Sequence, residues 1–406
     1  MIQIDGTRLN ASLQELATIG ATPAGGVTRL SLSDEDKTAR DLLARWMTEA
    51  GLEMRVDDLG NMSGIRPGTE DGPPVYLGSH IDTVVRGGRY DGALGVMGAL
   101  EVIRTLNDHD VQTRLPVGIV NWTNEEGVRF EPATLASGVI AGAFTRDYAY
   151  GISDRAGLSF GDELVRIGYQ GDEAHRPLPA SAYLELHIEQ GPVLESLGKP
   201  VGVVGGIVGI IWNEVVVIGQ SDHAGPSPMP LRKDALMAAS VMMASIEKLA
   251  LDRDDVAVAT VGRIKVEPDT INTIPGKAVF SVDFRHPDGE TIEYLARELE
   301  KLGDTVARNR GVEIVVERIW TSDPTPFDPA VVEAIRSGCR ALGIPYEELW
   351  SGAGHDAKHL ADLVPSGMIF VRSQGGVSHA EIEESTPEDI TAGGNVLLQA
   401  ALSLAR

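Results

Sequence analysis

Five residues of the types that bind divalent metals lie in polar, glycine-containing turns of this chain. They are three histidines and two acids: His80, Asp91, Glu126, His187 and His379. Metals of the zinc type prefer imidazole nitrogen and carboxylate oxygen, and a pair of such ions needs one carboxylate that can bridge them. A single histidine or acid in a loop is usually solvated or hydrogen-bonded, but the five together favour a metal site.

Two further acids have the spacing for supporting roles. Asp82 lies shortly after His80 and could reach back to the second imidazole nitrogen, which would fix the tautomer of a ligand. The alternative for Asp82 is a cap of the turn. Glu125 directly precedes Glu126, and neighbours on extended backbone point opposite ways, so one could bind metal while the other faces a metal-bound water. The alternative for this pair is two exposed acids in a loop.

Three short apolar runs predict strands that would bring these side chains together. The runs cover 75–77, 117–120 and 183–186, and a polar cluster with a candidate residue follows each of them at once. Helical patterns cover 93–106 and the stretch from Ser33, a predicted cap, to Gly51. Strands that alternate with helices predict an α/β fold with a mixed, mostly parallel sheet, helices on both faces and ligands at the carboxyl strand ends.

The pattern changes near Trp212, which predicts an inserted domain at about 213–326. Periodicity there favours strand, helix, strand, strand, helix and strand at 214–219, 234–251, 256–266, 278–284, 290–302 and 312–316. This order is a ferredoxin-like α+β plan with a small core of its own. From Phe327 the α/β pattern returns, with helices near 328–342 and 387–405. We therefore expect a discontinuous catalytic domain made of 1–212 and 327–406.

Charge and composition exclude several classes of partner. The formal net charge of -24 argues against nucleic acid and anionic membranes, which repel an acidic protein. Cys339, the only cysteine, lies in a helical pattern, so core packing is favoured over chemistry, and a reducing compartment fits. The longest apolar run, 201–211, is short of the ~20 residues of a membrane span, and the N-terminus lacks a signal-peptide pattern. We expect a cytoplasmic protein.

Seven ordered motifs resemble those of the dinuclear amidohydrolases of the M20 peptidase superfamily. They are GSHIDTV at 78–84, GRYDG at 88–92, NEEGVRF at 124–130, LHIEQGP at 186–192, DHAG at 222–225, SGAGHDA at 351–357 and SH at 378–379. The branch that they are most similar to contains N-carbamoyl-L-amino acid hydrolases, β-ureidopropionase and allantoate amidohydrolase. His187 marks this branch, because superfamily peptidases commonly place a carboxylate at the corresponding position.

The resemblance implies a cofactor of two divalent ions, which could be zinc, manganese, cobalt or nickel. It divides the ligands into two groups around a shared carboxylate: His80 and His187 for one metal, Glu126 and His379 for the other, and Asp91 as the bridge. Glu125 would be the general base that takes a proton from the bridging water and delivers it to the leaving nitrogen.

The resemblance also implies substrate-binding residues and a homodimer formed through the inserted domain, which would act as a lid. His223 would stabilise the oxyanion, often from the partner subunit. Asn272 and Arg285 would bind the substrate carboxylate, a task that suits the planar fork of arginine. Gln190 and His355 would line the ureido end of the pocket.

The leading hypothesis is hydrolysis of the carbamoyl C–N bond of an N-carbamoyl-L-amino acid to the amino acid, ammonia and carbon dioxide. Allantoate or another ureido acid is the nearest alternative, followed by an N-acyl amino acid or dipeptide. A non-catalytic binding protein is disfavoured because Glu125 and every ligand are present. Arg372 departs from the family pattern, in which many members have proline. It could add a charge to the pocket, but a surface position is favoured.

Overall fold

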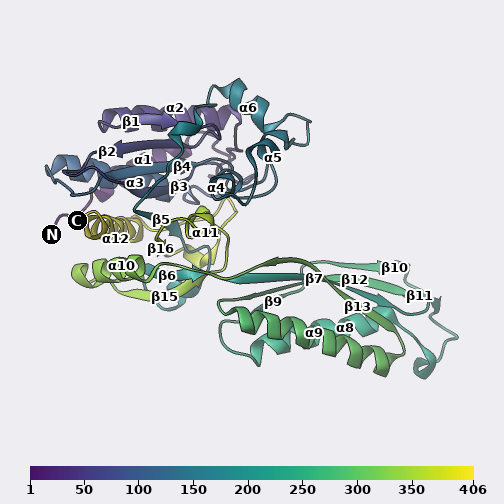
Figure 1. The fold of residues 1–406 in the computed structure, drawn as a ribbon. Helices are drawn as coiled ribbons and strands as arrows, with labels where there is room; N and C mark the ends of the chain where they lie inside the picture. Colours follow the sequence, from purple (N-terminus) through teal and green to yellow (C-terminus); the bar gives the residue numbers. More distant parts are fainter. The chain divides into compact units, whose positions relative to one another are not determined.

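The chain folds into two compact units in a computed structural model that describes residues 1–406 (Figure 1). Unit 1 consists of 1–206 with 326–406, and unit 2 of 207–325. Unit 2 starts before the predicted residue 213, because its first strand already begins at Gly209. An inserted segment is therefore enclosed by a discontinuous unit.

Unit 1 is built on one mixed sheet of nine strands. Its order is β1-β2-β4-β3-β5-β16-β6-β14, with β15 also paired to β6. The strands are β1 (Glu53–Val56), β2 (Met62–Arg66), β3 (Val75–His80), β4 (Val117–Trp122), β5 (Ala182–Ile188), β6 (Val201–Ile207), β14 (Thr325–Pro326), β15 (Tyr346–Ser351) and β16 (Ser366–Val371). The central strands β4, β3, β5 and β16 run parallel. Every residue of these four strands is buried, which explains the short, continuously apolar runs in the sequence.

Five long helices pack on this sheet and on one another. They are α1 (Gly6–Ala17), α2 (Asp34–Glu49), α3 (Ala93–Asp108), α10 (Pro329–Leu342) and α12 (Pro387–Leu404). Shorter segments are α4 (Leu135–Ile140), α5 (Arg146–Gly151), α6 (Phe160–Ile167), α7 (Val193–Ser196), α11 (Asp356–Leu360), η1 (Glu173–His175) and η3 (Gln374–Gly376). Together with the sheet they confirm the predicted α/β class. Cys339 is buried in α10, and burial raises the pKa of its thiol to about 12, as expected for a packing residue.

A buried ion pair fastens α2 to the loop that follows β4. Ser33 caps the helix by accepting the N–H of Asp36, as predicted. The carboxylate of Asp36 pairs with Arg40 at 2.8 Å, and both side chains are fully buried. Arg40 also donates to the carbonyl of Gly60 and to the hydroxyl of Thr123.

Unit 2 has the predicted ferredoxin-like order of elements. Its four main strands form an antiparallel sheet in the order β10-β12-β7-β13. The elements are β7 (Gly209–Ile218), β8 (Asp222–His223), η2 (Met229–Leu231), α8 (Ala235–Leu251), β9 (Val258–Thr260), β10 (Ile264–Glu267), β11 (Thr273–Ile274), β12 (Lys277–His286), α9 (Gly289–Arg310) and β13 (Glu313–Ser322). The single strand predicted at 256–266 is wrong, because it is broken into β9 and β10 around Gly262, a residue with no side chain to pack.

The core of unit 2 lies between its sheet and helices α8 and α9, which lie on one side of the sheet (Figure 1). Strand β12 alternates buried and half-buried residues along its whole length. Large apolar side chains are also exposed on this unit, including the neighbouring rings of Trp212 and Trp320. In neither unit does a helix have the length and apolar character needed to cross a membrane.

Removal of the buried charge of Arg40 should destabilise unit 1. In Arg40→Met the carboxylate of Asp36 stays buried without its cation, which costs about 3–5 kcal/mol of unfolding free energy. Urea unfolding followed by tryptophan fluorescence measures this loss. The matched change Lys37→Met removes an exposed partner of Asp41 on the same helix and should cost below about 1 kcal/mol. Equal losses in the two variants would contradict the role given to the buried pair.

Candidate metal centre

The polar clusters that follow the parallel strands meet at one edge of the sheet of unit 1. His80 is the last residue of β3, Glu125 and Glu126 follow β4, and His187 is close to the end of β5. His379 lies in the loop after β16. Because these four strands are parallel, their carboxyl ends share one edge.

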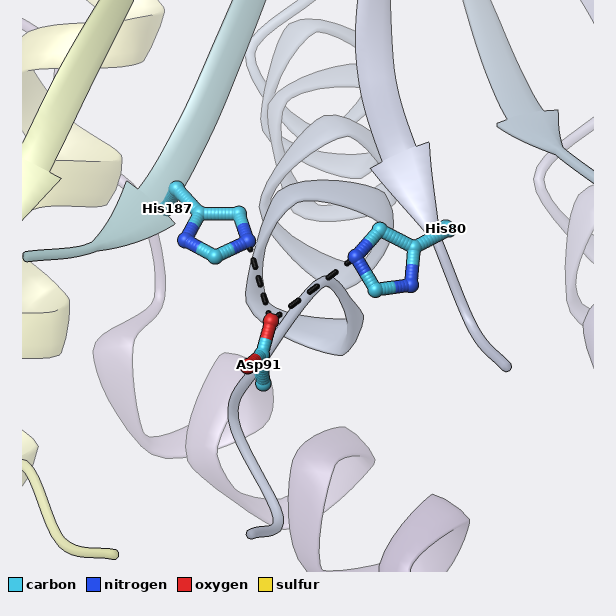
Figure 2. A group of neighbouring side chains, drawn as sticks. All are labelled: His80, Asp91 and His187. Atoms are coloured by element: carbon cyan, nitrogen blue, oxygen red, sulfur yellow. Dashed lines mark ion pairs between the residues drawn. The ribbon is translucent and has the colours of Figure 1, made fainter. Parts of the chain in front are cut away.

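Asp91 lies at the centre of this group, just before α3. Its Oδ1 is 3.1 Å from Nε2 of His187 and 3.7 Å from Nε2 of His80 (Figure 2). Its Oδ2 is 3.3 Å from Nε2 of His379. Each oxygen of one carboxylate therefore faces a different set of histidines, which is the geometry that a bridging ligand needs.

The candidate ligands form two groups of three that share Asp91. One group is His80, Asp91 and His187, and the other is Asp91, Glu126 and His379; in each group the possible ligand atoms lie within 4.8 Å of one another. One oxygen of Glu126, Oε2, lies 3.5 Å from Nε2 of His379, and the other, Oε1, is buried and has no hydrogen-bond partner. A buried carboxylate oxygen without a donor is costly, so this atom fits a cation.

Main-chain carbonyls orient both imidazoles of the first group. Nδ1 of His80 lies 2.9 Å from the carbonyl oxygen of Asp82, and Nδ1 of His187 lies 2.9 Å from that of Ile188. A carbonyl only accepts, so each Nδ1 carries a hydrogen, and Nε2 is the nitrogen that faces Asp91 and holds the lone pair whenever the ring is neutral (Figure 2). This is the tautomer that a metal ligand requires.

The carboxylate of Asp82 does not make the hydrogen bond expected for it. Its Oδ1 is 3.8 Å from Nδ1 of His80, because the main chain of the same residue takes that position. The carboxylate instead accepts the N–H groups of Glu125 and Glu126, each at 3.3 Å. Asp82 therefore holds the loop that carries the two glutamates.

Glu125 and Glu126 lie in a bend of the loop after β4 and not in a strand. Asn124 has a φ of 61°, and the carbonyl of Glu125 accepts the N–H of Thr134 at 2.6 Å. The carboxylate of Glu125 nevertheless reaches the histidine group, with Oε2 3.5 Å from Nε2 of His80. Burial, followed by the charges of nearby carboxylates, raises the pKa of both glutamates well above the ordinary value. So dense a set of acids calls for cations.

Burial and the nearby carboxylates shift the pKa values of the two buried imidazoles in opposite directions. Burial lowers the pKa of His80 to about 4. Burial also opposes protonation of His187, but the hydrogen bond and charge of Asp91, together with the charge of Glu185, outweigh it and raise the pKa of His187 to about 9. Asp91 is buried too, yet its hydrogen bonds with His187 and His379 hold its pKa well below the usual range. A protonated His187 here occupies the place of positive charge that a metal would supply.

Two glycines of the GRYDG motif make this packing possible. Gly92 has a φ of +63°, and a Cβ there would lie 2.3 Å from the ring of His80. A Cβ on Gly88 would lie 1.9 Å from the carboxylate of Glu383. The motif is therefore explained by the close approach of its backbone to two side chains.

The other predicted residues fall into both units. In unit 1, Gln190 donates to Asp91 Oδ2 at 2.9 Å and its own oxygen is buried without a partner, while the ring of His355 lies 4.5 Å from that of His187. In unit 2, β8 and β11 place His223 beside the segment of Asn272, whose carbonyl accepts the N–H of Ala224.

Arg285 and Arg372 both pair with acids. Arg285, on β12, forms an ion pair with Asp283 on the same strand, at 2.7 Å. Arg372 forms one with the buried Asp389 of α12, at 2.8 Å. The surface interpretation of Arg372 is therefore incomplete, because its guanidinium ties the loop after β16 to the first turn of that helix.

Sequence reasoning missed two buried carboxylates around the centre. Glu185 forms a third possible ligand group with His187 and His355, but Ser79, Tyr183 and the N–H of Ala357 already satisfy its oxygens. Glu383 accepts the N–H of Asp91. Neither has a spacing signal, since Glu185 lies inside an apolar strand and Glu383 in an acidic loop.

Comparison with known proteins agrees with this geometry. A family model described as Peptidase family M20/M25/M40 matches residues 76–403. The chain belongs to this family. An N-carbamoyl-L-amino-acid amidohydrolase of Rhizobium meliloti is 43% identical over 404 residues, which is 99% of this chain and 97% of that protein. Allantoate amidohydrolase of Escherichia coli is 36% identical and covers 96% of this chain and 95% of its own.

A solved structure supports the same branch of the M20 family. An amidase of the hydantoinase/carbamoylase family from Burkholderia multivorans matches with a TM-score of 0.97 and 48% identity, over 100% of this chain and 98% of that one. This M20 chain is thus an amidohydrolase of the hydantoinase/carbamoylase family. The family and the two histidine–carboxylate groups together indicate metal binding.

Substitution of Gly92 should disrupt the centre more than its backbone conformation alone explains. Gly92→Ala forces a methyl group against the His80 ring, so we expect loss of bound metal, counted by inductively coupled plasma mass spectrometry. Gly198→Ala is the control, because Gly198 has a nearly equal φ of +64° but open space around it. Gly198→Ala should lose about 1–2 kcal/mol from its positive φ, and Gly92→Ala should lose more, because its ψ of -50° lies outside the left-handed helical region. Full metal content in Gly92→Ala would contradict this account of the motif.

Proposed function

We propose that this chain hydrolyses the carbamoyl C–N bond of an N-carbamoyl-L-amino acid and releases the amino acid, ammonia and carbon dioxide. The observation that carries the proposal is the position of the Asp91 carboxylate, which is shared by two groups of candidate metal ligands. The Glu125 carboxylate lies next to His80 of one of these groups. The Rhizobium meliloti relative, similar over nearly the whole chain, supports the substrate class.

In this proposal the cofactor is two divalent ions of the zinc, manganese, cobalt or nickel type. His80, Asp91 and His187 would hold one ion, and Asp91, Glu126 and His379 the other. Ions bound there lower the pKa of a water and polarise a carbonyl group. Imidazole and carboxylate donors suit all four metals, and the set contains no thiolate that would select a softer ion.

Glu125 would act as general base and then as general acid. It is buried, lies against the His80 group and binds no ion in this scheme. Its raised pKa lets it keep the proton that it takes from water and deliver it to the leaving nitrogen. Asp82 assists by holding the main chain of Glu125 and Glu126.

The remaining residues would bind the substrate. Gln190 has its amide nitrogen on Asp91, so its buried, unpartnered oxygen is available to an N–H donor such as a ureido group. His355, beside His187, would contact the same end. The inserted unit would supply His223 for the oxyanion, and Asn272 and Arg285 for the carboxylate, as a lid in a homodimer.

Allantoate is the second candidate, because the Escherichia coli allantoate amidohydrolase is similar over 96% of this chain. Allantoate is also a ureido acid, so the same centre would serve it. The shape of the pocket decides between the two substrates.

A substrate panel tests the proposal, with ammonia release measured for the ureido substrates and newly formed free amino groups measured for the N-acetyl amino acids and dipeptides. The panel contains N-carbamoyl-L-amino acids, their D-enantiomers, allantoate, N-acetyl amino acids and dipeptides, each assayed with metal-reconstituted protein. We expect the highest kcat/KM on an N-carbamoyl-L-amino acid. Turnover of allantoate alone would favour the second candidate, and turnover of acyl or peptide bonds alone would reject the ureido assignment.

Replacement of Glu125 tests the mechanism. Glu125→Gln removes the proton acceptor, so kcat should fall roughly 10²–10⁴-fold while the metal content stays at the wild-type level. Glu131→Gln, a change of an exposed glutamate in the same loop, should leave kcat unaffected. Unchanged turnover in Glu125→Gln would overturn the assignment of the general base.

A further inference from the structure

Glu383 is a buried carboxylate next to the centre that the proposed reaction does not use. Its side chain is 1% exposed, and it lies in the loop between η3 and α12, shortly after His379. Oε1 accepts the main-chain N–H groups of Tyr90 and Asp91, at 3.0 and 3.1 Å. Oε2 lies 3.0 Å from the hydroxyl of Ser378.

These contacts close a ring between two distant segments of the chain. Ser378, which directly precedes His379, also lies 3.0 Å from Oδ2 of Asp91. Glu383 thus holds the main chain of Asp91 with one oxygen and the residue before His379 with the other. Both Asp91 and His379 belong to the same candidate group, so this carboxylate contacts the two segments that supply those ligands.

The neighbouring Glu384 provides a built-in contrast. Its carboxylate accepts the hydroxyl of Tyr90 at 2.8 Å and pairs with Arg89. The Glu384 carboxylate thus contacts side chains of the 88–92 segment, whereas the Glu383 carboxylate binds the main-chain N–H of Asp91 and the hydroxyl of Ser378. Gly88 leaves the space into which the Glu383 carboxylate fits.

We propose that Glu383 is a positioning residue, which holds Asp91 and His379 at the separation that the metal shared by Asp91, Glu126 and His379 requires. This inference rests on the proposed two-metal function. Burial of one more carboxylate beside Asp91 is unfavourable by itself. Residues that hydrogen-bond to metal ligands hold them in their binding orientation, and loss of such a residue typically weakens metal binding roughly 10–100-fold.

Metal titration of the apo-protein tests this role without any substrate. Wild type, Glu383→Ala, Glu383→Gln and the matched control Glu384→Ala are titrated with Co²⁺ by calorimetry, and the visible absorption of bound cobalt is recorded. We expect two ions in the wild type and in Glu384→Ala. Glu383→Ala should bind one ion roughly 10–100-fold more weakly, with a changed cobalt spectrum.

The conservative variant separates positioning from charge. Glu383→Gln keeps an acceptor for the two N–H groups, and its amide can donate to Ser378, so it should recover most of the affinity. If Glu383→Ala does not fold, as judged by circular dichroism, Glu383→Asp replaces it. That variant keeps the charge but is one methylene shorter, so it should also bind the ion more weakly.

Three results would overturn the role of Glu383. They are wild-type affinity for both ions in Glu383→Ala or its Glu383→Asp replacement, an equal loss in Glu384→Ala, and no recovery in Glu383→Gln. A wild-type protein that binds fewer than two ions would contradict the proposed pair of metals instead, so the two failures are distinguishable.

Discussion

The structure of this amidohydrolase depends on a concentration of buried negative charge around Asp91. Asp82, Asp91, Glu125 and Glu383 are all at most 7% exposed, and Glu126 lies beside them. Carboxylates this close cannot all stay ionised in a buried site unless positive charge compensates them. The raised pKa values of His187 and His379 let these two rings supply part of that positive charge, whereas His80, with a pKa of about 4, stays neutral.

The candidate ligands are positioned by buried strands and by main-chain hydrogen bonds. Parallel strands deliver His80, the Glu125–Glu126 loop and His187 to one edge, and every residue of those strands is buried. The carbonyls of Asp82 and Ile188 then fix the imidazole tautomers, so orientation does not depend on mobile side chains. Sites held in this way keep their ligands close to bonding geometry before any ion arrives.

The sequence was informative where a residue type and a regular pattern coincide. Apolar runs followed by polar clusters predicted the strand ends, and the alternation of elements predicted the ferredoxin-like order of unit 2. The break between β9 and β10 was missed, because the apolar pattern continues on both sides of Gly262 and was given more weight than the glycine. The predicted contact between the Asp82 carboxylate and the His80 ring is not formed, since spacing does not tell whether the carbonyl or the carboxylate of a residue reaches a ring. Glu383 needed the tertiary structure, because its partners Tyr90 and Asp91 are distant in the sequence.

The two candidate groups differ in their access to solvent. The side chains of His80 and His187 are 1% exposed, whereas that of His379 is 53% exposed. In the proposed enzyme, an ion held through His379 would exchange with the medium faster than one enclosed by the other two histidines. On dilution or brief exposure to a chelator, the group of His80 and His187 would then keep its ion longer than the group of His379.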